Sequence, residues 1–239
     1  MGFARGPNIV TDGLVLTLDA ASPKSYPGSG TTLFDLSGNG NEGTLTGGPT
    51  FSSQNNGAIQ VDGSKNIAIT GMPTTNNYTL CIWSLNLGPT AFANVGHRTY
   101  ACTDNFRFQW DDTSSTTIAR GPFVDFVSTS GNLTPSNFTS QSPSDLFNKW
   151  NLTSMTSDGS ITTIYFNNIQ GATTTSARVF STDGAMTIGT NNLSGIGGAD
   201  NFNRDGGNCF FGPVYVYDRA LTANEITQNY NTLKPRFEL

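Results

Sequence analysis

Oxygen-bearing side chains alternate with other residues, mostly glycines, in one loop near the N-terminus, a pattern typical of sites for hard cations. Asp35, Ser37, Asn39 and Asn41 occupy every second position there. This spacing allows a turning backbone to surround Ca²⁺ with oxygen ligands. The bidentate acid that would complete a calcium loop is missing, and Asx turns with glycines also shape rigid loops that hold no metal. We therefore predict either a calcium site or a self-contained loop, with residues 200–205 as a lesser candidate of the same kind.

The acidic residues do not form the pair that a glycosidase needs. Such enzymes place two carboxylic acids on either side of the scissile bond. The three glutamates are dispersed, with Glu42 in a glycine-rich loop, Glu225 in a helix-capping motif and Glu238 in the C-terminal tail. Asp111 and Asp112 are adjacent, but neighbours on a strand point to opposite faces. We therefore expect a protein that is not an enzyme.

Chemistry based on histidine or cysteine finds little support. His97 is the only histidine, and no G-x-S-x-G motif accompanies it, which is typical of a solvated loop residue. The three cysteines, Cys81, Cys102 and Cys209, show no C-x-x-C spacing. We expect neither zinc nor a disulfide framework, so calcium is the one cofactor that the sequence suggests.

The composition is that of a β-rich, turn-rich chain with few charges. Of the 239 residues, 36% are hydrophobic, 12% are charged and 27 are glycine, which disfavours long surface helices. The net charge is -5 and the 12 basic residues are scattered, so nucleic acid is a poor candidate partner. No run approaches the roughly 18 apolar residues of a membrane span, and the N-terminus lacks a signal-peptide core. We expect synthesis in a cytoplasm and no membrane insertion.

Short strands separated by turns account for most of the chain. Leu14, Leu16 and Leu18 alternate with other residues, which predicts a strand with one apolar face at residues 13–19. The residues at 150–170 indicate a hairpin that turns at Asp158-Gly159. Further strand-like runs cover residues 58–62, 66–70, 78–87, 105–110 and 122–128.

The C-terminal part predicts a final strand and then the one helix of the chain. Valines alternate with tyrosines toward the end of residues 209–217. Thr222 and Glu225 form a capping box, and the helical pattern extends to about Leu233. We predict an all-β fold, a two-sheet antiparallel jelly-roll sandwich with one short C-terminal helix. Residues 13–239 would form a single domain behind an N-terminal arm at residues 1–12.

Two groups of terminal motifs carry a family resemblance. The first consists of residues 6–16 (GPNIVTDGLVL) and 35–41 (DLSGNGN), and the second of residues 216–222 (VYDRALT), followed by Glu225 and Ile226. Together they resemble the laminin G-like, concanavalin A-like jelly-roll family, in the form met in bacteriophage structural proteins. Residues 88–145 match none of its motifs. The resemblance implies a concanavalin A-like jelly roll and a viral structural role.

On that resemblance, we predict a non-enzymatic virion structural protein. It would be a capsid decoration or fibre-associated surface protein of a bacteriophage, located on the virion surface. Its partners would be viral capsid or tail proteins and further copies of itself in a multi-copy assembly. The alternative is a lectin-like carbohydrate-binding module that recognises host surface glycans.

Residues at both chain ends are of types that anchor interfaces. Phe3 and Arg5 lie in the predicted arm, and Arg236 and Phe237 lie in the C-terminal tail. Aromatic and arginine side chains are enriched among the residues that dominate interface energies. We predict that these four residues contact assembly partners, with fraying of both ends as the alternative.

Aromatic side chains in the unmatched middle region are candidates for stacking on sugar rings. Alternation of the first three of these residues is more often typical of a strand that faces the core, and a binding platform is the alternative. These residues are Phe106, Phe108, Trp110, Phe123 and Phe126.

Overall fold

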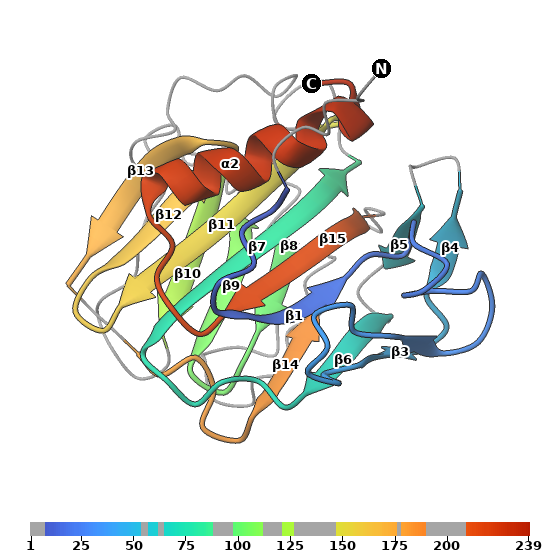
Figure 1. Ribbon diagram of the computed structural model, residues 1–239, viewed down its shortest axis with the longest axis horizontal. Coiled ribbons are helices and arrows are strands. Elements are labelled where there is room, and N and C mark those ends of the chain that lie inside the picture. Colours follow the sequence, from blue (N-terminus) through green and yellow to red (C-terminus); the bar gives the residue numbers. More distant parts are fainter. Residues whose placement is uncertain are drawn as a thin grey trace, which may run out of the picture.

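The structure is a computed structural model that describes residues 8–53, 57–61, 65–87, 98–111, 121–126, 147–175, 178–189 and 209–239. Within these ranges two antiparallel β-sheets pack face to face, and one α-helix lies near the C-terminus (Figure 1). This arrangement confirms the predicted all-β sandwich. No helix in these ranges is long and apolar enough to cross a membrane.

The first and last strands are neighbours in the larger sheet. Eight strands form this sheet, in the order β13 (Ile169–Thr174), β12 (Thr162–Phe166), β11 (Trp150–Asp158), β7 (Asn77–Asn86), β15 (Cys209–Tyr217), β5 (Ala58–Val61) and β4 (Thr50–Ser52), with β1 (Leu14–Leu18) also paired to β15. Seven strands form the other sheet, in the order β10 (Gly121–Phe126), β9 (Phe106–Asp111), β8 (Arg98–Cys102), β14 (Ala185–Ile188), β6 (Asn66–Thr70), β3 (Gly43–Thr46) and β2 (Thr32–Leu33).

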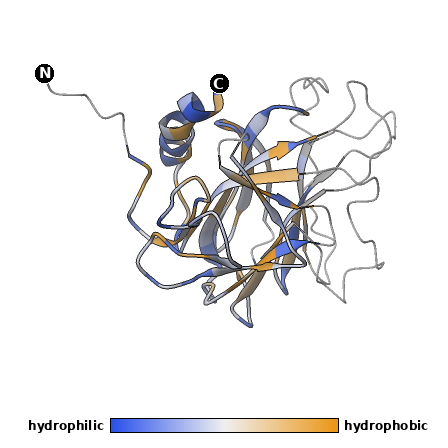
Figure 2. Ribbon diagram, turned by 90° about the vertical axis from the view of Figure 1, so that its right-hand side faces the viewer, coloured by the Kyte–Doolittle hydropathy of each residue, from blue (hydrophilic) through white to orange (hydrophobic). Residues whose placement is uncertain are grey.

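Alternation along the central strands produces two separate apolar clusters. Ile82 of β7 and Val214 of β15 face the interior between the sheets. Their neighbours Trp83 and Tyr215 point to the opposite face and pack in a second cluster. In Figure 1, α2 (Ala223–Leu233) lies across this outer face of the eight-stranded sheet, and Figure 2 shows it from the side. The helix therefore covers a face that would otherwise expose large aromatic rings.

The first strand departs from its predicted pattern at one residue. Leu16 and Leu18 enter the interior between the sheets, but Leu14 packs against the second cluster. The register between β1 and β15 shifts between Leu14 and Leu16. An irregularity of this kind changes the face to which the flanking side chains point, which a strict alternation does not anticipate.

The predicted turn and cap signals are confirmed. The β11–β12 hairpin turns at Asp158-Gly159, where Gly159 has a φ of 88°. The Thr222 side chain accepts a hydrogen bond from the backbone N–H of Glu225, and the Glu225 carboxylate accepts one from the N–H of Thr222 at 2.8 Å. The helix ends at Leu233, and a short 3-10 helix η1 (Lys234–Phe237) continues from it.

Candidate functional site

One face of the seven-stranded sheet carries a continuous row of small and polar side chains. Strand pairing aligns one residue from each of six adjacent strands, from β2 at the edge through β3, β6, β14 and β8 to β9. In that order the residues are Thr32, Thr44, Ala68, Thr187, Cys102 and Arg107, and we call them the cross-strand row.

The cross-strand row lies on the outer face of its sheet. Chain neighbours such as Ile67 and Met186 point into the interior, so the intervening residues point away from it. Thr44 is exposed, and the other members from β2 to β14 are half-buried. Cys102 and Arg107, at the β8–β9 end, are buried. The accessible part of the row therefore consists of its four residues on β2, β3, β6 and β14, three threonines and an alanine.

This accessible part suits a neutral ligand that is rich in hydroxyl groups. Threonine hydroxyls both donate and accept hydrogen bonds, and the methyl groups of threonine and alanine offer small apolar contacts. The four strands of this part, set side by side at about 4.8 Å, spread its residues over roughly 14 Å, which can hold an extended molecule. The row contains no carboxylate, so it offers no acid–base pair for cleaving a ligand.

The four predicted calcium ligands do come together, but their hydrogen bonds are made within the protein. Asp35 Oδ1 accepts from the backbone N–H groups of Thr17 (2.9 Å) and Ser37 (2.8 Å). Oδ2 accepts from the Ser37 hydroxyl (2.6 Å) and the backbone N–H of Asn41 (3.2 Å). The side-chain amides of Asn39 and Asn41 donate to main-chain carbonyls of β1. This geometry favours the self-contained loop, and calcium binding stays a prediction.

The hydrogen bonds also keep the Asp35 carboxylate ionised. Burial would raise the pKa of Asp35, but the hydrogen bonds from Ser37, Thr17 and Asn41 outweigh it and hold the pKa below its usual value. A carboxylate offers about four lone-pair sites, and here each oxygen already accepts two hydrogen bonds. In the described ranges, no group of three or more histidine, cysteine, aspartate or glutamate residues could hold a metal ion.

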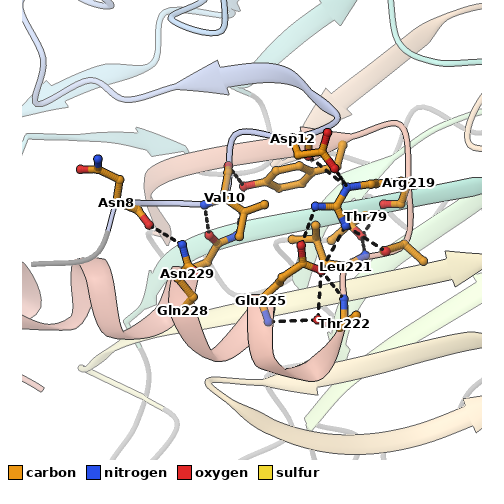
Figure 3. Close-up of polar contacts among 12 residues, drawn as sticks. Asn8, Val10, Asp12, Thr79, Arg219, Leu221, Thr222, Glu225, Gln228 and Asn229 are labelled. Atoms are coloured by element: carbon orange, nitrogen blue, oxygen red, sulfur yellow. Dashed lines mark hydrogen bonds and ion pairs between the residues drawn. The ribbon is translucent and has the colours of Figure 1, made fainter.

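Asn8 and Val10, which the sequence placed in an arm, are hydrogen-bonded to the C-terminal helix (Figure 3). Asn229 Oδ1 accepts a hydrogen bond from the backbone N–H of Val10 at 2.8 Å, and the Tyr217 hydroxyl donates to the Val10 carbonyl at 3.0 Å. Gln228 Nε2 donates to the Asn8 carbonyl at 2.8 Å. These hydrogen bonds attach Asn8 and Val10 to the rest of the domain, and residues 1–7 lie outside the described structure.

Arg219 connects this segment to the start of the helix (Figure 3). Its Nε lies 2.9 Å from Asp12 Oδ2, and its two terminal nitrogens lie 2.6 and 3.1 Å from the Glu225 carboxylate oxygens. Hydrogen bonding to Arg219 is the main cause that lowers the pKa of Glu225 to about 2. Glu225 is therefore an ionised structural residue at neutral pH rather than a proton donor.

The predicted interface residues of the tail are engaged within the chain. Phe237 is 5% exposed, and its ring lies 4.5 Å from the ring centroids of both Trp83 and Trp150. Arg236 Nη1 lies 2.8 Å from Asp19 Oδ2. Phe237 thus contributes to the second cluster instead of presenting its ring to a partner. Phe3 and Arg5 lie outside the described residues.

The middle-region aromatics that the structure describes belong to the core. Phe106, Phe108 and Phe126 are buried in the interior between the sheets, which supports the core-strand alternative. The side chains of Trp110, Phe123 and Asp111 lie outside the described structure, as do His97, Asp112 and residues 200–205 in full.

Sequence reasoning missed the cross-strand row because its members are far apart in the chain. Thr44 and Thr187 lie two strands apart only because β3 and β14 both pair with β6. The available signal was local: Thr44 and Thr46 alternate with Leu45, and Thr187 lies between Met186 and Ile188. That alternation predicts a polar outer face, but it gives no register between strands.

Comparison with protein families gives one match, and comparison with solved structures gives several. Residues 53–227 match the family model described as the concanavalin A-like lectin/glucanases superfamily. Domain 4 of AbnA, an extracellular arabinanase from Geobacillus stearothermophilus solved in complex with arabinotriose, shares 15% identity at a TM-score of 0.63, covering 91% of this chain and 98% of that domain. A search of curated proteins found no match.

Two toxin domains show the same fold over part of their length. The binding domain of Paraclostridial Mosquitocidal Protein 1 shares 18% identity at a TM-score of 0.61, covering 93% of this chain and 52% of the other. The ligand-binding domain of botulinum neurotoxin serotype D, solved with N-acetylneuraminic acid, shares 11% identity at a TM-score of 0.62, covering 93% and 51%. This chain therefore spans about half of each toxin chain, and at these identities the likeness shows the fold alone.

Proposed function

We propose that this chain, which belongs to the concanavalin A-like lectin/glucanases superfamily, is a carbohydrate-binding module without catalytic activity. The observation that carries this proposal is the cross-strand row, a flat strip of hydroxyl-bearing and small side chains on the outer face of a sheet. Structural neighbours solved with arabinotriose and with N-acetylneuraminic acid give independent support.

The proposed ligand lies along the accessible part of the row, from β2 to β14. Hydroxyl groups of a sugar would exchange hydrogen bonds with Thr32 and Thr44, and the CH groups of the ring would contact Ala68 and the threonine methyl groups. A site built from few directional contacts on a flat surface gives modest affinity, because much of the ligand stays in water. We therefore expect an oligosaccharide to bind more tightly than a monosaccharide.

Replacing Thr44 by arginine should block this surface. Thr44 is exposed, so the long side chain is tolerated by the fold but covers the row and removes a hydroxyl. We expect Thr44→Arg to weaken binding at least tenfold, about 1.4 kcal/mol. The measurement is a glycan array with the intact protein, followed by calorimetric titration with the strongest hit and with arabinotriose and a sialylated oligosaccharide as defined probes.

The matched control is Thr173→Arg. Thr173 is an exposed threonine on β13, in the other sheet, so it introduces the same charge and length away from the row. Thr173→Arg should bind as the unmodified protein does. An array without any hit would refute the carbohydrate-binding function, whereas equal affinity of the two variants would keep the function and refute the site.

The second part of the proposal is that this module is located on the surface of a virion. The terminal motifs that resemble bacteriophage proteins form one unit, because β1 pairs with β15 and Asn8 and Val10 bind α2. A capsid decoration or fibre-associated protein would present the cross-strand row to a host glycan. Mass spectrometry of purified particles should detect the chain in several copies per particle, and its absence from particles would end the virion proposal.

A further inference from the structure

One edge of β1 is covered by a loop and not by a strand. β1 pairs with β15 along one side, and no strand pairs with its other side among the residues that the structure describes (Figure 1). The segment at residues 35–41, the Asp35 loop, lies against that other side and forms hydrogen bonds with its backbone. We call this side of β1 the covered edge.

The backbone groups of Thr17 define the direction of the covered edge. The Thr17 N–H donates to Asp35 Oδ1 at 2.9 Å, and the Thr17 carbonyl accepts from the N–H of Leu36 at 2.8 Å. Both groups of one residue therefore point away from β15, as they do at alternate residues of an edge strand. Two residues further on, the N–H of Asp19 donates to Ser25 Oγ at 3.2 Å.

The carbonyls at the start of β1 are covered by side chains of the same loop. The Val15 carbonyl accepts from the Ser37 hydroxyl at 3.1 Å and from the Asn41 side-chain amide at 2.9 Å. The Leu14 carbonyl accepts from the Asn39 side-chain amide at 3.2 Å. A carbonyl oxygen has two lone pairs, so that of Val15 is fully occupied. These side chains thus take the donors' place that a neighbouring strand would otherwise fill.

The alternate spacing of polar residues in the Asp35 loop fits this arrangement. Ser37, Asn39 and Asn41 are separated by Gly38 and Gly40, whose φ angles are 93° and 77°. A backbone with positive φ at every second residue is not an extended strand. The loop therefore presents no straight row of N–H and C=O groups of its own, and the sheet ends at β1.

We infer that the Asp35 loop prevents β1 from pairing with β1 of a second copy of this chain. An edge strand with unpaired N–H and C=O groups is a template for pairing, and natural proteins block such edges with loops among other means. Two identical edges can pair antiparallel around a two-fold axis, which gives a closed dimer. Such pairing would need the hydrogen bonds of the loop to break first. Copies of this chain that assemble therefore join through other surfaces.

A variant that combines Asp35→Ala, Ser37→Ala and Asn41→Ala opens the covered edge. It removes the acceptor of the Thr17 N–H and both donors to the Val15 carbonyl. Its mass, measured by light scattering after size-exclusion chromatography, should rise to about twice that of the wild type as the protein concentration increases. Circular dichroism of the same fractions checks that the variant is folded.

Adding Thr17→Pro to this triple variant should return its mass to that of the wild type. Proline has no N–H to donate and is tolerated on edge strands. Because the Thr17 N–H points away from β15, its loss removes no hydrogen bond between β1 and β15. The added proline is not expected to restore the stability lost with the loop contacts. A return to the wild-type mass thus distinguishes edge pairing from aggregation of a weakened fold.

Two further variants complete the test. The double variant Ser37→Ala, Asn41→Ala keeps Asp35 and serves if the triple variant does not fold; its mass should also rise with concentration, but less. Thr222→Ala weakens the fold by removing the helix cap and should keep the mass of the wild type. The inference is overturned if every loop variant that folds keeps the wild-type mass, or if Thr17→Pro leaves the association of the triple variant unchanged.

Discussion

Replacing Phe237 by alanine should lower the free energy of unfolding by about 3–5 kcal/mol, the usual cost of truncating a buried phenylalanine. The ring is 5% exposed and lies 4.5 Å from the centroids of both Trp83 and Trp150. Its removal leaves a cavity between two large rings that belong to different strands, so the gap closes poorly. For a domain of this size the loss corresponds to a fall in Tm on the order of 10 °C.

Thermal melts and tryptophan fluorescence measure this effect together. The emission of Trp83 and Trp150 should shift to longer wavelength as water reaches the cavity. Leu239→Ala is the control, because Leu239 is 42% exposed at the end of the same segment and should change stability by less than about 0.5 kcal/mol. If Phe237 instead anchored an assembly partner, the alanine variant would keep its Tm and lose assembly, and that result would contradict the packing role.

The sequence of the tail could not show whether Phe237 packs within the chain or anchors a partner. Phenylalanine is typical both of interface anchors and of cores, and nothing within residues 234–239 distinguishes the two. The outcome depends on Trp83, which lies more than 150 residues earlier in the chain, and on the path of α2 across its sheet (Figure 1). A contact of such long range leaves no local pattern.

Local signals predicted the elements whose stability is local. The capping box of Thr222 and Glu225 and the turn at Asp158-Gly159 need only a few consecutive residues, and both were predicted. By contrast, β14 is four residues long and was not predicted. It is a strand because β6 and β8 pair with it on either side, and four residues carry too little pattern to indicate this.

The Asp35 loop also combines a feature that its own residues predict with one that depends on a distant strand. Alternate oxygen side chains correctly predicted that Asp35, Ser37, Asn39 and Asn41 come together. They did not show that Thr17 of β1 provides a backbone donor for Asp35 at 2.9 Å. That donor comes from a strand 18 residues earlier. The loop sequence alone therefore could not show whether the partner of the carboxylate is a metal ion or a set of backbone N–H groups.

Replacing Asp35 by asparagine should therefore destabilise the protein by about 2–4 kcal/mol at neutral pH, because charge-assisted hydrogen bonds are lost and buried donors are left without an acceptor. The carboxylate accepts from the backbone N–H groups of Thr17, Ser37 and Asn41 and from the Ser37 hydroxyl. An amide keeps the shape but presents N–H groups to two of these donors. Urea unfolding of both proteins measures the difference.

The difference in unfolding free energy between the wild type and Asp35→Asn should depend on pH. The pKa of Asp35 is lowered in the folded state, so its contribution to stability is present above the unfolded value of about 3.9 and is lost as pH falls through the folded pKa. The stability difference between the wild type and Asp35→Asn should thus be constant from pH 7 to pH 5 and shrink below pH 4. A difference that stays constant down to pH 2 would show that the charge of Asp35 does not contribute.

The response of Tm to calcium distinguishes the two interpretations of this loop, and the structure favours the self-contained loop. If the loop bound Ca²⁺, the ion at a hundredfold excess over Kd would stabilise the fold by about 2.7 kcal/mol, and Asp35→Asn would lose that shift. Because each Asp35 oxygen already accepts two hydrogen bonds, we expect identical melts in excess EDTA and in millimolar calcium.

Asp158→Asn is the control for the substitution itself. Its carboxylate accepts from Ser160 and Ile161 in an exposed turn, where water replaces a lost acceptor, so its melt should shift less than that of Asp35→Asn. A calcium-dependent rise in Tm that Asp158→Asn keeps and Asp35→Asn loses would establish the metal site instead.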